Sequence, residues 1–295
     1  AIRNVNRDGH DYIPQAIKNG ATKVIVEEGN YDVETVVVED TRAYLKDYLY
    51  EHYYPYFKDM KLIGVTGTNG KTTIGYMMYQ MMTMLDIPCA YMGTIGFYYC
   101  GNFIKMVNTT PDVDVLYDYF IKAKDAGCKV LVMEVSSHAL AKDRIHGLEF
   151  DEVAFTNLTQ DHLDFHKTFE NYFQAKYKLF QRSRIKIINI DDNYGKRALE
   201  NLKNENAKDI YTYSIKEESD FKAYEEKCES KHIAFKLKVN GKEEEFIVGL
   251  PGEFNIYNSL GAIGATSKLG ISLESIKKGI EDVVVPGRCE MVGKK

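Results

Sequence analysis

Short apolar runs alternate with amphipathic segments along most of this chain of 295 residues. From residue 61 onward, runs rich in Val, Ile and Leu predict buried strands at 61–66, 129–133, 153–156, 186–190 and 210–213. Apolar residues spaced three or four apart predict helices between them, at 72–85, 113–126 and from Phe169 onward. Because strands that are apolar on both faces need helices on both sides, this rhythm predicts an α/β fold on a doubly wound, mainly parallel sheet.

The two ends of the chain depart from this rhythm. Before the first buried strand, a small α/β unit is predicted from elements at 12–19, 23–27, 35–39 and 42–52, followed by a linker at 54–59. Near the other end, the turn residues Asn240 and Gly241 separate two alternating runs, which predict a β-hairpin, and helices follow at 255–269 and 273–281. We therefore predict a partial N-terminal domain at 1–58, a central domain at 59–285, and at 286–295 a linker to a further domain.

Composition narrows the classes of function. A net charge of −5 and a pI near 5.9 argue against nucleic acid or an anionic membrane as the main partner. The five cysteines are scattered without a CxxC pair, which is typical of reduced thiols in a cytoplasmic protein. The chain starts without Met and stops where a strand at Val285 is beginning, so we expect a fragment of a longer protein.

The strand at 61–66 leads directly into a loop of small and polar residues, which is followed by a helix. Its members are Gly67, Thr68, Asn69, Gly70, Lys71, Thr72 and Thr73. This context predicts a phosphate-binding loop, because backbone N–H groups and the helix N-terminus converge on phosphate oxygens. Lys71 then reaches the β- and γ-phosphates of ATP, and the Thr72 hydroxyl binds Mg²⁺. Val65 occupies the place of the first glycine of the standard GxxxxGK[ST] spacing, so a glycine-rich turn with a chance lysine is the alternative.

Three enzyme classes use such a loop: switch GTPases, kinases or ATPases, and ATP-dependent ligases. A GTPase needs an Asn-Lys-x-Asp guanine motif, which the sequence lacks. The side chains around the loop must decide between the other two.

Glu134 follows the strand at 129–133, and its carboxylate is expected in the crevice at the strand ends, where it would bind Mg²⁺. Its alternative role is to cap the following helix. Ser136, Ser137 and His138 come next, and we favour contacts to substrate or phosphate over a nucleophilic serine, because no Gly-x-Ser-x-Gly elbow surrounds them.

After the strand at 153–156, two histidines and two aspartates fall between 161 and 166. This density of ligand-type side chains favours His162 as a metal or phosphate ligand, and His166 less so.

Lys176 falls on the apolar stripe that Phe169, Phe173 and Phe180 define on one helix. A lysine that points inward needs a partner or a changed charge state. It can form a salt bridge, react with CO₂ to give a carbamate that binds Mg²⁺, or extend its ammonium group to solvent. Periodicity does not choose among these.

Taken together, these residues resemble the Mur ligase family, and most closely its MurE-type members, which add the third amino acid to the peptidoglycan precursor. The resemblance covers the whole chain and rests on motifs that occur in the family's order. Beyond the loop and the segments just described, these begin at Asp8, Asn108, Phe254 and Val285.

The resemblance implies roles for individual residues. One Mg²⁺ is bound by Thr72 and Glu134, and a second by His162 and a carbamylated Lys176. The uridine and muramoyl-peptide part of the substrate is held by Asn6, Arg7, Asn108, Thr109, Thr110, Ser136 and Arg144. Asn258 contacts the adenine of ATP. Lys142 stands where many family members have glutamine.

The activity implied is ATP-dependent amide bond formation. The terminal carboxylate of UDP-MurNAc-L-Ala-D-Glu attacks the γ-phosphate of ATP, and a free amino acid captures the acyl phosphate. Lys71, Lys176 and His162 are the expected catalytic residues, and the isolated fragment is expected to be inactive. Folylpolyglutamate synthase is the enzymatic alternative and a nucleotide-binding module the non-catalytic one. The intact loop and site residues argue against the second.

Overall fold

The computed structural model describes residues 1–4, 7–239 and 241–288, and it divides the chain into two compact units, Ala1–Pro55 and Tyr56–Lys295. In the small unit, β1 (Arg3–Asn4) and β2 (Arg7–Asp8) form an antiparallel pair. A 3-10 helix (Gly9–Tyr12) and α1 (Ile13–Lys18) follow, and β3 (Lys23–Val26) pairs in parallel with β4 (Glu34–Val37). Ile13, Val24 and Val26 form its small buried core.

Helix α2 (Thr41–Phe57) is longer than the sequence predicts. It begins where Asp40 Oδ1 accepts hydrogen bonds from the N–H groups of Arg42 and Ala43, which is an N-cap. The linker predicted at 54–59 is wrong, because the helix continues through Pro55 to Phe57. The Phe57 ring packs edge-on against the rings of Tyr117 and Phe120. This contact stabilises the additional helical turn.

The described residues of the large unit form an eleven-stranded sheet. In order across the sheet the strands are β15 (Lys242–Val248), β14 (Ile233–Val239), β13 (Phe221–Cys228), β12 (Ile210–Ser214), β11 (Ser183–Asn189), β10 (Phe150–Phe155), β5 (Lys61–Thr66), β9 (Val130–Glu134), β6 (Cys89–Gly93), β7 (Gly96–Tyr99) and β8 (Asn102–Ile104). Strands from β13 to β6 in that order pair in parallel, and both ends of the sheet are antiparallel hairpins.

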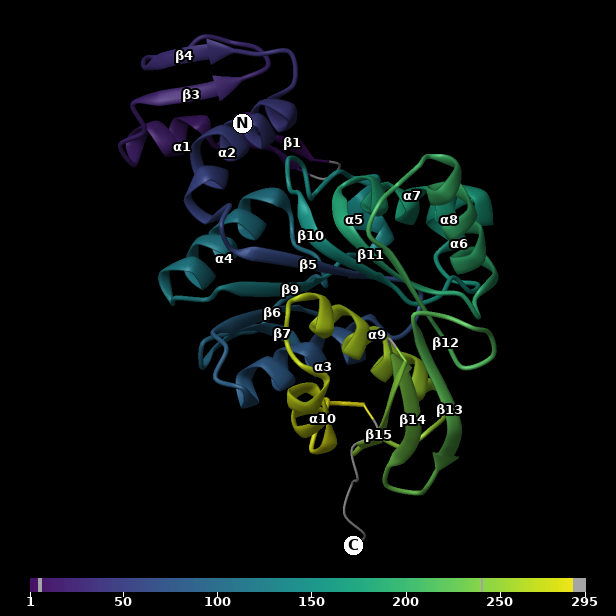
Figure 1. Ribbon diagram of the computed structural model, residues 1–295. Helices are drawn as coiled ribbons and strands as arrows, with labels where there is room; N and C mark the ends of the chain where they lie inside the picture. Colours follow the sequence, from purple (N-terminus) through teal and green to yellow (C-terminus); the bar gives the residue numbers. More distant parts are fainter. Residues whose placement is uncertain (5–6, 240, 289–295) are drawn as a thin grey trace, which may run out of the picture. The chain divides into compact units, whose positions relative to one another are not determined.

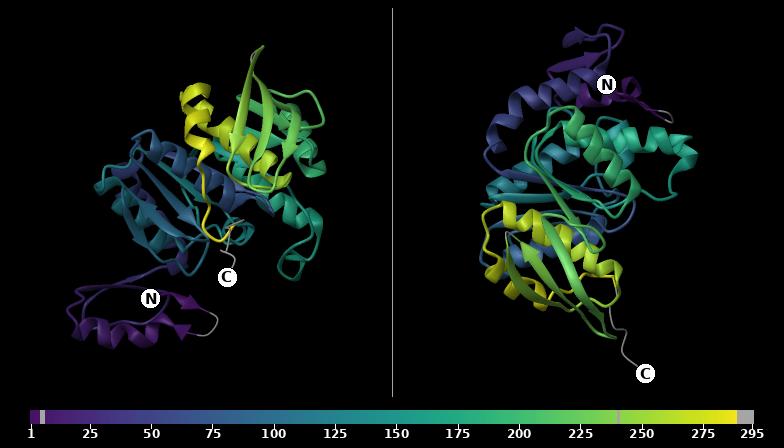
Figure 2. Two further views of the ribbon diagram at one scale, coloured as in Figure 1. Left: turned by 90° about the horizontal axis from the view of Figure 1, so that it is seen from below. Right: turned by 45° about the vertical axis from the view of Figure 1, so that its right-hand side comes forward.

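Helices cover both faces of this sheet, as a doubly wound fold requires (Figure 1). One face carries α3 (Lys71–Met84), α9 (Phe254–Lys268) and α10 (Leu273–Glu281). Helices α9 and α10 lie against the antiparallel strands at one end (Figure 2). The other face carries α4 (Val113–Asp125), α5 (Ser137–Ala141), α7 (Phe169–Gln181) and α8 (Asn193–Asn204), with the short α6 (Leu163–His166) beside α7.

The α/β fold class predicted from the sequence is confirmed, and the predicted hairpin is β14–β15, whose turn residue Asn240 lies outside the described residues. The sequence did not reveal β6–β8 or β13. At the end of the chain, the strand expected at Val285 is a single bridge to Arg288, and residues 289–295 lie outside the described part.

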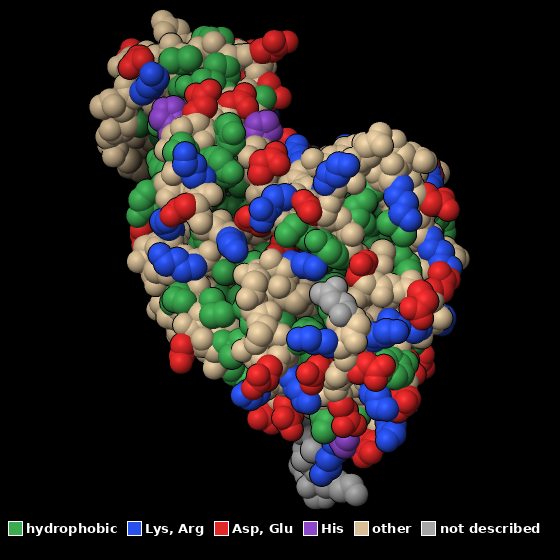
Figure 3. Space-filling view, viewed as in Figure 1, with side chains coloured by type: hydrophobic (Ala, Val, Ile, Leu, Met, Phe, Trp, Pro, Cys, Tyr) green, Lys and Arg blue, Asp and Glu red, His purple; other side chains and the backbone are tan. Residues whose placement is uncertain are grey.

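The surface of the large unit is mixed in charge. Lys and Arg side chains are interspersed with Asp and Glu over the face in Figure 3, without a broad region of one sign. Within the described ranges, no helix has the length and apolar character that crossing a bilayer requires.

Candidate functional site

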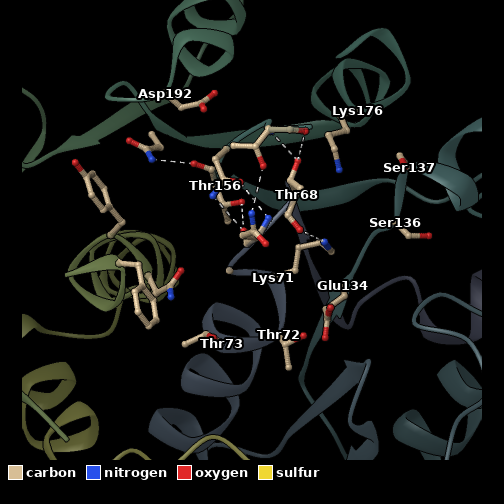
Figure 4. A pocket seen from close by; sticks show the side chains of 18 of the residues that line it. Thr68, Lys71, Thr72, Thr73, Glu134, Ser136, Ser137, Thr156, Lys176 and Asp192 are labelled. Atoms are coloured by element: carbon tan, nitrogen blue, oxygen red, sulfur yellow. Dashed lines mark hydrogen bonds between the residues drawn. The ribbon is translucent and has the colours of Figure 1, made fainter. Parts of the chain in front are cut away.

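A cavity of about 770 Å³ lies in the large unit at the carboxyl ends of the parallel strands. Residues 68–73 of the loop predicted to bind phosphate, 67–73, line this cavity. The ends of β9, β10 and β11 and the start of α9 line it as well. Figure 4 shows the side chains that line it. This is the edge of a doubly wound sheet at which ligands bind, because loops from neighbouring strands diverge there.

Two glycines give the loop its shape. Gly67 and Gly70 have positive φ of 147° and 88°, and Gly70 is the N-cap of α3. A Cβ on Gly67 would lie 1.8 Å from the Thr156 Oγ1, and one on Gly70 would lie 2.4 Å from the Asn258 Oδ1. Only glycine fits these two positions, so the loop's backbone can approach its neighbours closely.

The segment after β10 holds the loop in place. The Asn69 N–H donates to Asn157 Oδ1 at 3.0 Å, and the Asn69 carbonyl accepts from the Thr156 hydroxyl at 2.5 Å. The Thr68 N–H donates to the Asn157 carbonyl at 2.8 Å. On its other side, the Thr68 hydroxyl lies 3.1 Å from the Tyr172 hydroxyl. The loop is therefore ordered by side chains that are distant in the sequence.

Lys71 folds back over this loop. Its Nζ donates to the carbonyl oxygens of Gly67 and Thr68 at 2.8 and 2.9 Å. Burial lowers the pKa of the Lys71 ammonium, and the nearby Glu134 carboxylate acts in the opposite direction. If a phosphate group bound here, the Lys71 ammonium could donate to a charged oxygen in place of these neutral carbonyls, and that hydrogen bond would be stronger.

Glu134, at the end of β9, is fully buried on the cavity wall. Its Oε1 accepts from the Tyr91 hydroxyl and from the Thr94 N–H, the latter at 2.9 Å. It does not cap the next helix, because the Ser136 hydroxyl accepts from the Ala139 N–H and performs that task.

Lys176 points inward, as its place on the apolar stripe predicts. It is 1% exposed, which rules out an ammonium that reaches solvent, and its Nζ donates to the Gly67 carbonyl at 2.8 Å. Its Nζ also lies 4.8 Å from the centre of the Tyr172 ring. No carboxylate of the described part forms a salt bridge with it. Burial, and then the charge of Lys71, lower the pKa of Lys176 well below its usual range.

Three histidines gather beside the cavity. His162, with a positive φ of 52°, lines the cavity, and its ring centre lies 4.8 Å from that of His138. His166 is buried and stacks on the Tyr172 ring at 4.9 Å, outside the lining of the cavity. Among the described residues, no three His, Cys, Asp or Glu side chains are close enough to hold a metal ion by themselves. A metal here would need other donors, such as the Thr72 hydroxyl or a ligand's phosphate oxygens.

The predicted substrate contacts divide into two groups. Thr109 and Ser136 line the cavity. Thr110 is buried, and its hydroxyl donates to the Glu134 carbonyl at 2.8 Å. Arg144 forms a salt bridge with Asp112 at 2.7 Å and donates to the Thr110 carbonyl, so it supports this loop from behind the cavity.

The remaining predicted contacts have different outcomes. Asn108 is exposed and does not line it. Arg7 lies on β2 of the small unit, and Asn6 lies outside the described residues. Asn258 does line the cavity, on α9, and its side-chain amide donates to Asn255 Oδ1 at 2.9 Å.

Sequence reasoning missed several lining residues: Thr156, Asn157, Tyr172, Asn189, Asp191, Asp192, Tyr213, Phe254 and Tyr257. The two aspartates had a usable signal, because they follow the predicted strand at 186–190 just as Glu134 follows its own. Asp191 accepts from the Ile215 N–H at 2.8 Å, and Asp192 caps α8 and accepts from the Leu158 N–H at 3.3 Å. Both shape the cavity wall.

Comparison with known proteins shows similarity over the whole chain. The family model of the Mur ligase middle domain matches residues 65–266. The UDP-N-acetylmuramoyl-L-alanyl-D-glutamate–2,6-diaminopimelate ligase of Clostridium perfringens is 45% identical to the chain over its whole length. The ligase of the same name from Clostridium tetani is 43% identical over 99% of the chain. The chain spans 61% of the length of each of these relatives.

A solved structure gives the same result. A structure of a UDP-N-acetylmuramoyl-L-alanyl-D-glutamate–2,6-diaminopimelate ligase aligns with 97% of this chain at a TM-score of 0.84 and 27% identity. The chain corresponds to 59% of that structure. The similarity therefore extends over both units of the chain and over the strands that carry the cavity.

Proposed function

This chain belongs to the Mur ligase family, and from that premise we propose that it is part of an ATP-dependent ligase that adds 2,6-diaminopimelate to UDP-MurNAc-L-Ala-D-Glu. The names of its relatives support this substrate pair. The sequence alone leaves the amino acid open between diaminopimelate and lysine. The observation that carries the proposal is the convergence of Lys71 and Lys176 on the Gly67 carbonyl, beside the buried Glu134.

The loop at 67–73 would hold the phosphates of ATP. Its backbone N–H groups and the start of α3 supply partial positive charge, and Lys71 supplies a full one. Asn258, which lies next to Gly70 on the cavity wall, would contact the base.

The chemistry of the donors fits Mg²⁺. Thr72 and Glu134 offer a hydroxyl and a carboxylate on the same side of the cavity (Figure 4), and Mg²⁺ prefers such oxygen ligands. We propose that they hold one Mg²⁺ and that His162 and Lys176, as its carbamate, hold a second. Bound there, the ions would neutralise charge on the transferring phosphoryl group.

Carbamate formation starts from a neutral amine, and the surroundings of Lys176 shift its equilibrium in that direction. Burial and the neighbouring Lys71 favour the neutral form, and this is the direction in which its pKa is shifted.

The reaction needs a carboxylate to become an acylating agent. The terminal carboxylate of the dipeptide attacks the γ-phosphorus of ATP, the bond to ADP breaks, and an acyl phosphate results. The amine of the incoming amino acid then attacks the acyl carbon, phosphate leaves, and the amine loses a proton. Lys71 would stay in contact with the γ-phosphate through the transfer and stabilise its charge. Thr109 and Ser136, which line the cavity, would hold the peptide end of the substrate.

We expect this chain by itself to bind nucleotide weakly and not to complete the reaction, because it spans only 61% of the length of its relatives. Measured ATP-dependent amide formation by the 295-residue chain would contradict that expectation.

The test of the proposal is phosphate release by the full-length protein with UDP-MurNAc-dipeptide, comparing diaminopimelate, lysine and a folate acceptor. We expect release with diaminopimelate, and at least a hundredfold loss in Lys71→Ala, since a charged contact in the transition state is removed. Lys58→Ala, which changes an exposed lysine outside the cavity, is the control. Release only with a folate acceptor would replace the proposal by a folylpolyglutamate synthase activity.

A further inference from the structure

Two thiols that are far apart in the sequence meet at the edge of the large unit. The Sγ atoms of Cys100 and Cys128 lie 3.0 Å apart, although 28 residues separate them in the chain. A disulfide bond is about 2.05 Å long, so a movement of about 1 Å would join them. Neither residue lines the cavity described above.

The turn that carries Cys100 is unsuited to cysteine. Cys100 and Gly101 form the two-residue turn between β7 and β8, in which Tyr99 pairs with Asn102. Both turn residues have positive φ, 43° and 83°, as a type I′ hairpin turn requires. Asn-Gly is the favoured pair for this turn, and a residue with a larger side chain is disfavoured in the left-handed region. Cys100 therefore has an unfavourable backbone conformation, and it is this residue whose thiol lies next to Cys128.

The two thiols differ in access. Cys100 is exposed, whereas Cys128 is 1% exposed in the turn between α4 and β9, where its N–H donates to the Ala123 carbonyl. Burial, and then the Cys100 thiol, raise the pKa of Cys128. An external reagent therefore meets Cys100 first, and Cys128 is the partner that resolves what forms there.

We propose that Cys100 and Cys128 are a reversible thiol–disulfide pair that reacts with low-molecular-weight disulfides such as glutathione disulfide. The Cys100 thiolate attacks one sulfur of the reagent, a mixed disulfide forms, and one thiolate of the reagent leaves. The Cys128 thiolate then attacks the Cys100 sulfur and displaces the second. Two protein thiols are oxidised, one disulfide of the reagent is reduced to two thiols, and the two protons pass to the released thiolates.

The bond would close a loop that has a place in the proposed function. Residues 101–127 include Thr109 on the cavity wall and Thr110 behind it, together with α4. Oxidation would fix both ends of this segment to each other and restrict its local opening. This consequence rests on the proposed substrate role of the segment, whereas the thiol chemistry does not.

The experiment measures thiols without nucleotide or substrate, so its outcome is independent of the proposed function. The purified chain is equilibrated with glutathione and glutathione disulfide at graded ratios, acid-quenched, unfolded and alkylated. We expect two of the five thiols to disappear together. Peptide mapping should then show Cys100 linked to Cys128, and reduction should restore both. Backbone hydrogen exchange within 101–127 should slow in the oxidised form and return on reduction.

Variants separate this pair from general reactivity. Cys128→Ser should stop the reaction at a glutathione adduct on Cys100, and Cys228→Ser, which changes another exposed cysteine, should leave the linked peptide unchanged. Cys100→Asn suits the turn, so it should fold and lose the disulfide. The proposal would be overturned if, at every ratio tested, Cys100 of the wild-type chain carried glutathione while Cys128 remained a free thiol and was alkylated. A different cysteine pair would overturn it as well.

Discussion

At the scale of single residues, the site depends on polar groups that the fold has buried at a free-energy cost. Lys176 and Glu134 are almost fully removed from solvent, yet each has hydrogen-bond partners supplied by other elements. Glu152 differs, because it is 1% exposed on β10 and its Oε2 lacks a hydrogen-bond partner among the described residues. Glu152 lies on a central strand, where it pairs with Ile63 and Ile185. This position accounts for its burial, which is the main influence on the pKa of its carboxyl.

Glu152 predicts a pH dependence of stability. Burial raises the pKa of its carboxyl from 4.5 to about 8. Because the folded-state pKa lies above the unfolded one, the stabilisation is complete below about pH 4.5 and is lost as the pH rises through 8. Glu152→Gln stays neutral, so the difference in unfolding free energy between variant and wild type should shift in favour of the variant by a few kcal/mol between pH 5 and pH 9.

Denaturant unfolding of both proteins at several pH values measures this shift. All other titrating groups are shared, so their contributions cancel in the difference. A difference that stays constant from pH 5 to pH 9 would show that the Glu152 carboxyl titrates normally.

The contacts of Asn157 with the loop predict that its removal weakens nucleotide binding. Its side chain binds both the N–H and the carbonyl of Asn69, at 3.0 and 3.3 Å. In Asn157→Ala the loop must be ordered when the ligand binds, at a cost of about 1–2 kcal/mol, which is roughly a 5- to 30-fold rise in Kd. Calorimetric titration with an ATP analogue measures it, and Asn204→Ala, on the exposed end of α8, is the matched control. Equal Kd values for the two variants would show that the hydrogen bonds from Asn157 to Asn69 do not support nucleotide binding.

At the scale of elements, local pattern identified most of the strands and helices because their apolar residues repeat with a regular period. The strand at 61–66 and the helix at 273–281 are found with the bounds that the sequence predicts. The strands β6–β8 were missed because glycines at 93, 96 and 101 divide the segment between Cys89 and Ile104 into short runs. The end of α2 was missed because Pro55 signals a break, whereas burial of Phe57 favours helix.

The start of α2 predicts a local stability effect. Asp40 caps two N–H groups, so Asp40→Ala should destabilise the small unit by about 1 kcal/mol. The hydrogen-exchange rates of the α2 amide groups, measured at short labelling times, should rise several-fold in this variant. Glu39→Ala, at the exposed neighbouring position, should leave it unchanged. Equal exchange in both variants would show that the cap contributes nothing.

At the scale of the whole molecule, two units of unequal size share one chain. Among the described residues, the small unit has a core cluster of three buried apolar side chains and two two-stranded sheets, whereas the large unit has helices on both faces of an eleven-stranded sheet. A unit with so small a core is expected to open at a lower free energy.

This difference predicts a separate response to ligand. The amide groups of β3 and β4 should exchange faster than those of β5 and β10. Magnesium and an ATP analogue should slow exchange in the large unit around 67–73 and raise its unfolding midpoint, because only the folded state binds them. Exchange in β3 and β4 should not change. Equal protection of both units by nucleotide would contradict a binding site confined to the large one.

The sequence by itself determined what depends on neighbours along the chain: the strand, loop and helix around 67–73, the carboxylate at the end of β9, and the inward direction of Lys176. Each follows from periodicity or from the chemistry of a short segment. Only the tertiary structure decided which of these groups meet. Asn157 reaches Asn69 across 88 residues, Lys176 reaches the Gly67 carbonyl across 109, and Cys100 reaches Cys128 through a turn that its own sequence does not favour. Such contacts are set by the order of strands in the sheet, and no local pattern carries that order.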